Sequence, residues 1–297
     1  MTGEQTTEVF DYLMCSTGLH CMPNWPEFKN VENYKGILMH SVDYKTLDPR
    51  LKDKKVIVVG NSYSGVEIAS HLVGHAKTIV NIFNRPYLSF PRLLRVETNE
   101  KNVYQIIPVD LFYGREICFS IPLNKEEERK NKIEIFGKLC PHQTNKAKCH
   151  PAMYYELDDD EPIREAVTDN YYPYIQRGKI KPKKARITYF AEDGVRLSDG
   201  SFEKADVILL CTGYKICLNY FEQSVLDTLK FDPNREKLPI MLYKYTVHPD
   251  LENMAMIGVC SGLFFAGFEL QARWAFKLFK GKYKYIILLY FNSKLSK

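Results

Sequence analysis

The stretch "VIVVGNSYSGVEIASHL" at residues 56–72 decides the expected fold of this chain. It opens with a continuous apolar run typical of a buried strand, turns at Gly60, and continues with apolar side chains at helical spacing from Val66 to Val73. A second apolar run, "KTIVNIFNR" at residues 77–85, follows. A strand, a helix and a strand in this order predict one βαβ unit with parallel strands.

The turn at residues 60–65, "GNSYSG", is the candidate nucleotide site. Gly60 permits a sharp turn off the strand, and Gly65 permits close contact between helix and strand. Ser62 and Ser64 are small, so backbone N–H groups at the helix N-terminus are accessible to a pyrophosphate. Ser62 stands where the usual fingerprint has its middle glycine. The strand before and the helix after the turn favour dinucleotide binding over a plain βαβ turn.

The end of the second strand indicates which nucleotide is bound. NAD enzymes usually place an acid there for the ribose 2′-hydroxyl, whereas this strand ends in Asn84 and Arg85. Arg85 lies where a 2′-phosphate needs a cation, and Arg92 is a second candidate for that charge. The sequence therefore favours NADP over NAD. The alternative is that Arg85 only ends an exposed strand.

Composition sets the class of protein. The 297 residues are 45% hydrophobic and 26% charged, which predicts a globular chain with two domains. The net charge of +5 is mild, and we interpret the basic run at residues 179–184 as a solvated strand edge rather than a nucleic-acid patch. The eight cysteines lack disulfide or zinc-finger spacing, which predicts reduced thiols, no metal site and a cytoplasmic location.

The rest of the chain has a coarser pattern. Charge runs within residues 96–170 predict long loops and short helices. Residues 186–190 and 195–197 are expected to be strands, with a hairpin turn at Asp199 and Gly200. Further strands are predicted within residues 206–213 and 251–260, and an amphipathic helix over residues 268–280 that Gly281 ends.

Several motifs together resemble one family. "YKGILMHSVDYK" at residues 34–45 resembles the F-x-G-x-x-x-H-S-x-x-Y signature of flavin-containing monooxygenases. Its matching residues are Gly36, His40, Ser41 and Tyr44, with Tyr34 in place of the Phe. The Thr-Gly stretch at residues 10–28 and "DVILLCTGY" at residues 206–214 resemble other family segments, in the family's order. We interpret His40 as a residue that fixes the linker rather than a catalytic group.

The resemblance implies an α/β fold in which a Rossmann-like NADP-binding domain is inserted into an FAD-binding domain. It implies a partial FAD-domain segment at residues 1–45, the NADP domain at 46–205 and the returning FAD segment at 206–297. It also implies cofactor contacts. NADP would contact Gly60, Asn61, Ser62, Tyr63, Ser64, Gly65, Val66 and Glu67, with Arg85 on its 2′-phosphate. The flavin would lie near Thr17, Gly18, Thr212 and Gly213.

The implied activity is NADPH-dependent oxygenation of an amine nitrogen or a sulfide sulfur by a flavin C4a-hydroperoxide formed with O₂. The resemblance assigns no catalytic side chain. A second hypothesis is a binding module that keeps NADP and cannot hold FAD. A disulfide reductase would need a C-x-x-C or C-x₄-C pair, and no two cysteines have that spacing. A Baeyer–Villiger monooxygenase ranks below N- or S-oxygenation because its fuller signature is not evident.

The sequence departs from the family at both ends. It lacks the strand, Gly-rich turn and helix that open the family's FAD domain. A truncated gene model, a fragment, a pseudogene product and a degenerate paralogue would each explain this, and we expect the flavin half to be poorly packed unless a partner covers it. The tail, including the apolar "YIILLYF" at residues 285–291, has no assigned counterpart. That segment is too short to span a bilayer, so we expect at most peripheral contact with the endoplasmic reticulum, where some relatives attach.

Overall fold

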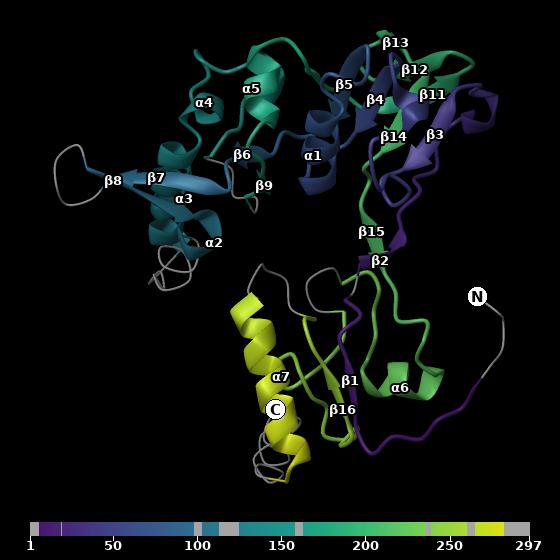
Figure 1. The fold of residues 1–297 in the computed structure, drawn as a ribbon, viewed down its shortest axis with the longest axis vertical. Helices are drawn as coiled ribbons and strands as arrows, with labels where there is room; N and C mark the ends of the chain where they lie inside the picture. The colour runs from purple at the N-terminus through teal and green to yellow at the C-terminus, as the bar shows by residue number, and fades with distance from the viewer. Residues whose placement is uncertain are drawn as a thin grey trace. The chain divides into compact units, whose positions relative to one another are not determined.

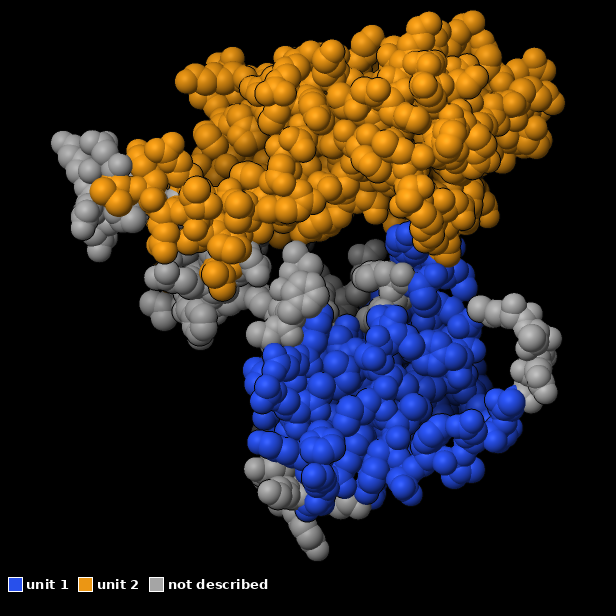
Figure 2. All heavy atoms as spheres, in the orientation of Figure 1, with its two compact units in different colours: residues 1–22, 214–297 blue, residues 23–213 orange. Residues whose placement is uncertain are grey.

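The computed structural model describes residues 6–18, 20–97, 103–112, 125–157, 163–235, 239–259 and 265–281. Contacts within the chain divide it into two compact units (Figure 2). Unit 1 comprises residues 1–22 and 214–297, and unit 2 comprises residues 23–213. The sequence therefore leaves the first unit, forms the second without interruption, and returns to the first.

Unit 2 is built on a five-stranded sheet in which every pairing is parallel. The strand order is β10-β5-β4-β14-β3. The strands are β3 (Ile37–His40), β4 (Lys55–Val59), β5 (Thr78–Phe83), β10 (Lys181–Lys184) and β14 (Val207–Leu210), with helix α1 (Tyr63–His71) joining β4 to β5 (Figure 1). The predicted βαβ unit is confirmed, although α1 begins at Tyr63, before the predicted start. The basic run forms the edge strand β10, as predicted.

Both faces of this sheet are covered, as a parallel sheet requires. Side chains alternate along β4, so Val56 and Val58 belong to the core beneath α1 and α5 (Tyr171–Gln176), while Ile57 belongs to the core on the other face. That other face packs on an antiparallel sheet. Its strands are β11 (Ile187–Ala191), β12 (Gly194–Leu197) and β13 (Phe202–Lys204), with the predicted hairpin turn between the last two.

Unit 2 extends beyond the predicted boundaries of residues 46–205. Strand β14 pairs with β3 on one side and with β4 on the other, with Val207 opposite both Ile37 and Val56. Backbone hydrogen bonds thus tie the linker signature and the strand before Thr212 into the same sheet as the turn. The short 3₁₀ helices Val31–Asn33 and Pro49–Leu51 lie in the same stretch.

Between β5 and β10 the chain forms an insertion. Strand β6 (Leu88–Phe90) pairs in parallel with β9 (Glu165–Val167), and β7 (Leu93–Glu97) pairs antiparallel with β8 (Tyr104–Pro108). Helices α2 (Val109–Phe112), α3 (Lys125–Leu139), α4 (Pro141–Thr144) and the 3₁₀ helix Pro151–Met153 complete it. The prediction of only long loops and short helices was wrong for the 15-residue α3. Its charge run supplies i,i+4 pairs, Glu126 with Lys130 and Glu134 with Lys138, which support a helix.

Unit 1 holds shorter pairings. Strand β1 (Leu13–Cys15) pairs in parallel with β16 (Met254–Met256), and β2 (His20–Pro23) pairs with β15 (Tyr214–Ile216). Helices α6 (Gln223–Thr228) and α7 (Phe265–Phe279) accompany them, and the Gly281 N–H donates to the Leu278 carbonyl at 2.8 Å beyond the end of α7. The strand and helix predicted here are confirmed. In the part of the chain that the structure describes, no helix has the length and apolarity that crossing a membrane requires.

Candidate nucleotide-binding site

The turn between β4 and α1 requires glycine at two positions. Gly60 has φ of 102°, and a Cβ built on it would lie 2.5 Å from the Cys211 carbonyl oxygen. A Cβ on Gly65 would collide with the Gly60 carbonyl oxygen. Both collisions are with backbone atoms, which cannot rotate away as a side chain can. The geometry therefore keeps α1, β4 and the end of β14 in close contact at this point.

The N-terminus of α1 presents unused backbone donors. Ser62 is the N-cap residue, but its hydroxyl makes no capping hydrogen bond, and the first bond of the helix runs from the Val66 N–H to the Ser62 carbonyl at 3.0 Å. Within the described ranges, no hydrogen bond uses the N–H groups of residues 62–65. Tyr63 and Ser64 are exposed. Donors at the positive end of a nine-residue helix suit an anion such as a pyrophosphate.

A buried polar network holds the turn from below. Asn81, on β5, is fully buried and donates through Nδ2 to the carbonyl oxygens of Val58 at 2.9 Å and Gly60 at 2.8 Å. The hydroxyl of buried Tyr171, on α5, donates to the Asn81 Oδ1 atom. Burial raises the pKa of Tyr171, so the hydroxyl remains a donor. Sequence reasoning missed Asn81, whose signal is a polar residue inside a buried strand.

Asn61 connects the turn to the loop after β5. Its side chain is buried, donates to the Arg85 carbonyl at 3.0 Å and accepts from the Tyr87 N–H at 3.2 Å. These bonds bring the predicted phosphate residue Arg85 beside the turn. The Asn61 amide thus contacts protein rather than facing solvent.

Arg92 and Glu67 are paired with each other. The Arg92 guanidinium contacts Glu67 Oε2 at 2.8 Å and Asp169 Oδ2 at 2.6 Å, and its backbone N–H donates to Asp169 Oδ1 at 2.9 Å. Hydrogen bonds to these carboxylates raise the pKa of Arg92. Two carboxylates compensate the one guanidinium of Arg92, which makes Arg92 a weak candidate for a phosphate contact. Glu67, predicted to contact NADP, directs its carboxylate to Arg92.

The Thr212–Gly213 turn is tied to Asn24. The Thr212 hydroxyl donates to the Asn24 carbonyl at 2.6 Å, and the Asn24 amide donates to the Thr212 carbonyl at 3.2 Å. The Asn24 N–H donates to the Gly213 carbonyl at 3.0 Å. Gly213 has φ of 79°, a conformation that favours glycine. Cys211, directly before this turn, contacts the Gly60 turn, so residues 212–213 follow a strand that ends at the candidate site.

The Thr17–Gly18 turn belongs to unit 1. The Thr17 and Tyr220 hydroxyls lie 2.7 Å apart, and Gly18 has φ of 73°. In the described residues, neither Thr-Gly turn presents a set of free backbone N–H groups at a helix N-terminus, as residues 62–65 do. These residues therefore do not by themselves define a flavin site.

His40 has the contacts of a structural residue. It is fully buried, its Nδ1 accepts from the Val42 N–H at 3.2 Å, and its ring centroid lies 5.5 Å from that of Trp25. Burial lowers the pKa of His40, so the ring remains neutral at pH 7. In the same signature, Tyr34 donates to the Ala205 carbonyl at 3.1 Å. These contacts support the interpretation that the signature fixes the chain path.

The described cysteines are all free thiols. Burial raises the pKa of Cys140 and of Cys211 to about 12, so both remain protonated and unreactive. Among the described residues, no group of three or more His, Cys, Asp or Glu side chains is arranged to hold a metal. Cys140, His142, Cys149 and His150 accordingly take no part in such a group.

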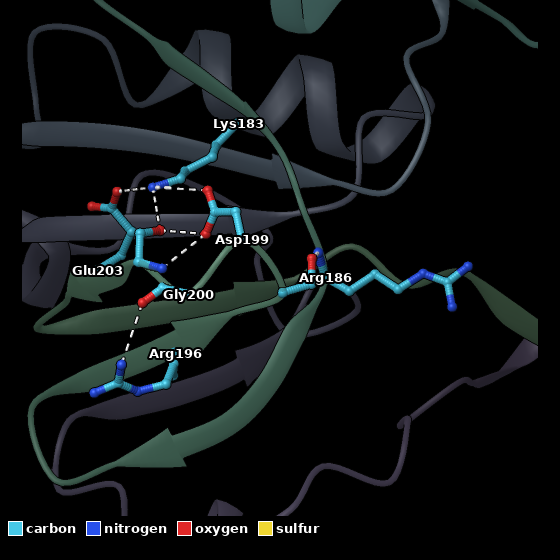
Figure 3. Close-up of polar contacts among 8 residues, drawn as sticks. Lys183, Arg186, Arg196, Asp199, Gly200 and Glu203 are labelled. Carbon is cyan, nitrogen blue, oxygen red and sulfur yellow. Dashed lines mark hydrogen bonds and ion pairs between the residues drawn. The ribbon is translucent and has the colours of Figure 1, made fainter.

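A second polar cluster lies where β10 meets the β12–β13 hairpin. Figure 3 shows Lys183 directed toward this hairpin, where its Nζ donates to Ser201 Oγ at 2.7 Å and to Glu203 Oε1 at 2.8 Å. The Asp199 carboxylate lies 3.8 Å away. The Arg186 side chain extends away from this cluster, and its Nε donates to Asn84 Oδ1 at 2.9 Å. That bond joins the segment after β10 to the loop after β5.

Comparison with known proteins gives one consistent result. The family model for flavin-binding monooxygenase-like proteins matches residues 1–287. Flavin-containing monooxygenase 5 of Mus musculus is 31% identical over 297 residues, covering 94% of this chain and 49% of the mouse protein. Dimethylaniline monooxygenase (N-oxide-forming) 4 of Rattus norvegicus is 28% identical over 296 residues, covering 94% of this chain and 47% of the rat protein.

Solved structures share the fold. The crystal structure of OTEMO in complex with FAD and NADP aligns with a TM-score of 0.60 at 16% identity and covers 91% of this chain and 60% of that one. The fold is therefore that of flavoprotein monooxygenases with two dinucleotide-binding domains, as predicted. The chain spans about half the length of the curated relatives named above.

Proposed function

The chain belongs to the flavin-binding monooxygenase-like family, and from that premise we propose that it binds NADPH at the β4–α1 turn and acts within an FAD- and NADPH-dependent monooxygenase. The observation that carries the proposal is the turn itself. Two positions exclude any side chain, and no hydrogen bond among the described residues uses the helix donors above them.

In this proposal, the pyrophosphate of NADPH accepts hydrogen bonds from the N–H groups of residues 62–65. Hydrogen bonds to a charged acceptor are stronger than neutral ones, and the helix dipole adds to them. Arg85 pairs with the 2′-phosphate. Asn61 and Glu67 contribute indirectly, because Asn61 holds the Arg85 loop and Glu67 holds Arg92.

The proposed reaction is oxygenation of a nucleophilic nitrogen or sulfur in a small molecule, with O₂ as co-substrate. A bound flavin supplies the redox chemistry, accepting a hydride from NADPH and activating O₂. This chain's residues bind and orient the nicotinamide nucleotide. The name of the rat relative, an N-oxide-forming dimethylaniline monooxygenase, supports nitrogen as the oxygenated atom. Thr17–Gly18 and Thr212–Gly213 are proposed to lie near the flavin, as the family resemblance implies.

We further propose a cytoplasmic location with peripheral contact to the endoplasmic reticulum membrane. The support is the cysteine usage, eight residues without disulfide spacing, together with the family resemblance.

The test is a two-part titration of the purified chain. NADPH binding is followed by nucleotide fluorescence, and FAD uptake is followed by absorbance before and after NADPH is added. We expect saturable NADPH binding and flavin bands that NADPH bleaches under anaerobic conditions. Absence of NADPH binding would refute the proposal. Binding of NADPH without flavin uptake would restrict the chain to the nucleotide-binding role.

A matched pair of variants connects the titration to the turn. Gly65→Ala places a methyl group against the Gly60 carbonyl, whereas Gly137→Ala adds one in α3, where the nearest atom is 4.0 Å away. We expect Gly65→Ala to abolish NADPH binding and Gly137→Ala to preserve it. Arg85→Ala, at an exposed site, should weaken NADPH binding and leave NADH binding unchanged.

A further inference from the structure

Two cysteines that lie far apart in the sequence meet in unit 1. Strands β2 and β15 pair with each other, Cys21 lies in β2, and Cys217 directly follows β15 (Figure 1). The Cys21 Sγ–H donates to the Cys217 carbonyl at 3.2 Å, although 196 positions separate the two residues. The two thiols are also within hydrogen-bonding reach of each other. A disulfide requires this kind of proximity, and both residues are free thiols.

The two thiols differ in their access to solvent. Cys21 is exposed, whereas Cys217 is buried, with 9% of its surface exposed. A small oxidant therefore reaches the Cys21 sulfur from solvent, and Cys217 lies behind it. This arrangement suits a pair in which Cys21 is oxidised first and Cys217 then attacks the oxidised sulfur.

A third cysteine, Cys15, lies near the pair without the same contact. Burial raises the pKa of Tyr220, and charge on Cys15, Cys21 or Cys217 would raise it further, so all three cysteines lie near the Tyr220 hydroxyl. Cys15 is buried in the core of unit 1, and burial raises its pKa. Among the described residues, the contacts of the Cys21 thiol are with Cys217. Cys217 is therefore the better placed of the two to form a disulfide with Cys21.

The pair lies close to both points in the sequence at which the chain changes unit. The first segment of unit 1 ends at residue 22, and its second segment begins at residue 214. A bond between Cys21 and Cys217 would therefore close a loop that contains all of unit 2. The longer such a loop is, the more conformational entropy a cross-link removes from the unfolded chain.

We propose that Cys21 and Cys217 form a redox modification site, at which a peroxide converts the two thiols into a reversible disulfide that joins the outgoing segment of unit 1 to the returning one. The inference goes beyond the proposed function and needs no bound nucleotide. It agrees with reduced thiols in the resting chain, because disulfides in reducing compartments are usually transient. Burial and the Cys217 thiol raise the pKa of Cys21, so the thiol stays protonated at pH 7 and the pair stays open until an oxidant is present.

The reaction consists of two displacements, one at oxygen and one at sulfur. The Cys21 thiolate attacks one oxygen of hydrogen peroxide, the O–O bond breaks, and the leaving hydroxide takes the proton lost by Cys21, which gives water and a sulfenic acid. The Cys217 sulfur then attacks the Cys21 sulfur. The S–S bond forms, the S–O bond breaks, and the Cys217 proton leaves in a second water. Two thiols thereby lose two electrons and two protons, and one peroxide is reduced to two waters. A dithiol restores both thiols by exchange and is itself oxidised.

The test is a non-reducing peptide map of the purified chain after a limited dose of hydrogen peroxide. Remaining thiols are alkylated under denaturing conditions, and cross-linked peptides are identified by mass spectrometry. We expect one intramolecular disulfide, between the peptides that contain Cys21 and Cys217, and its loss after treatment with dithiothreitol. A disulfide of Cys21 with Cys15, a bond between two copies of the chain, or no disulfide would each overturn the inference.

Matched variants assign the two roles. In Cys217→Ser the sulfenic acid at Cys21 has no resolving thiol, so a dimedone adduct should accumulate on Cys21. In Cys21→Ser no adduct should form on Cys217, because that thiol is buried. Cys149→Ser is the control, since the Cys149 thiol likewise donates to a backbone carbonyl, at 3.4 Å, and its removal should leave the Cys21–Cys217 disulfide unchanged. Equal adducts on Cys21 and Cys217 would overturn the assigned order of attack.

Urea unfolding tests whether the bond fits the pairing of β2 with β15. Oxidation should raise the urea midpoint of the wild-type chain by about 1 M, because the cross-link closes a long loop, and dithiothreitol should reverse the increase. The midpoint of Cys21→Ser should not change on oxidation. An unchanged or lower midpoint in the wild-type chain would show that the bond forms only when β2 and β15 separate, which would overturn the inference. None of these measurements uses a nucleotide, so a negative result leaves the proposal of NADPH binding intact.

Discussion

The two units bury their parallel strands differently. In unit 2, Val56, Ile57 and Val58 of β4 are at most 1% exposed, because helices cover one face of the sheet and an antiparallel sheet covers the other. In the described part of unit 1, β1 pairs with β16 alone, and its Leu13 and Met14 are 48% and 37% exposed. A turn that tolerates no Cβ needs rigid surroundings. In unit 2, packing on both faces of the sheet holds β4, the strand that leads into the turn, in place. The candidate site therefore depends on the packing of unit 2, whereas of the three residues of β1 only Cys15 is buried, in the core of unit 1.

The largest expected effect is a difference in local opening. Amides of β4 and β14 should exchange with solvent deuterium only on global unfolding, whereas those of β1 should exchange through local opening. The exchange rate of the β4 and β14 amides should therefore be lower by orders of magnitude than that of the β1 amides. Limited proteolysis should likewise cut residues 6–14 before it cuts any strand of the five-stranded sheet. Equal protection of β1 and β4 would remove the contrast between the units.

The next effect is at the turn. Gly65→Ala should destabilise unit 2 by roughly 3 kcal/mol, because the new methyl group meets a backbone carbonyl that cannot move without shifting β4 or β14. Urea unfolding monitored by tryptophan fluorescence measures it, since Trp25 lies in this unit. Gly137→Ala, in an open helical position, should instead stabilise by about 0.5 kcal/mol. Similar changes for both variants would mean that the close approach at the turn is not required.

A smaller loss is expected at the buried amide below the turn. Asn81→Leu removes both bonds to the Val58 and Gly60 carbonyls and leaves the Tyr171 hydroxyl without its acceptor, which should cost roughly 2 kcal/mol. Adding Tyr171→Phe should recover part of that loss, since the buried hydroxyl is then absent. Urea midpoints for the two single variants and the double variant measure this coupling. Strictly additive changes would show that Asn81 and Tyr171 do not act as one network.

The comparison also separates what the sequence could predict from what it could not. β4, α1 and β5 follow from apolar runs and small turn residues that lie within thirty positions of one another, and so were predictable. α3 was missed because its support comes from Glu–Lys pairs rather than from an apolar stripe. The role of Asn81 depends on a partner distant in sequence, because Asn81 bonds to Tyr171, ninety positions away. A short stretch of sequence does not show which distant residue a side chain contacts.

The smallest effect is a pH dependence that originates in the insertion. His142 is partly buried, its ring lies 4.3 Å from that of Tyr172, and its Nε2 lies 3.2 Å from the Ser89 carbonyl, to which a neutral ring donates. Burial lowers the pKa of His142 in the folded chain below its usual value near 6.5. As pH falls through about 6.5, the unfolded chain therefore binds the proton first, and the free energy of unfolding decreases until the folded-state pKa is reached.

His142→Gln isolates this contribution, because an amide keeps a donor for Ser89 and does not titrate. Urea unfolding at pH 7.5, 6.5 and 5.5 should show a shallower pH dependence for the variant than for the wild-type chain. Two other buried histidines, His40 and His248, also have lowered pKa values and should account for the slope that remains. Carboxylates such as Asp169, whose pKa is lowered, titrate below this window. If the free energy of unfolding had the same pH dependence in the variant and the wild-type chain, His142 would not contribute to it in this range. The His142 ring would then become exposed to solvent before it binds the proton.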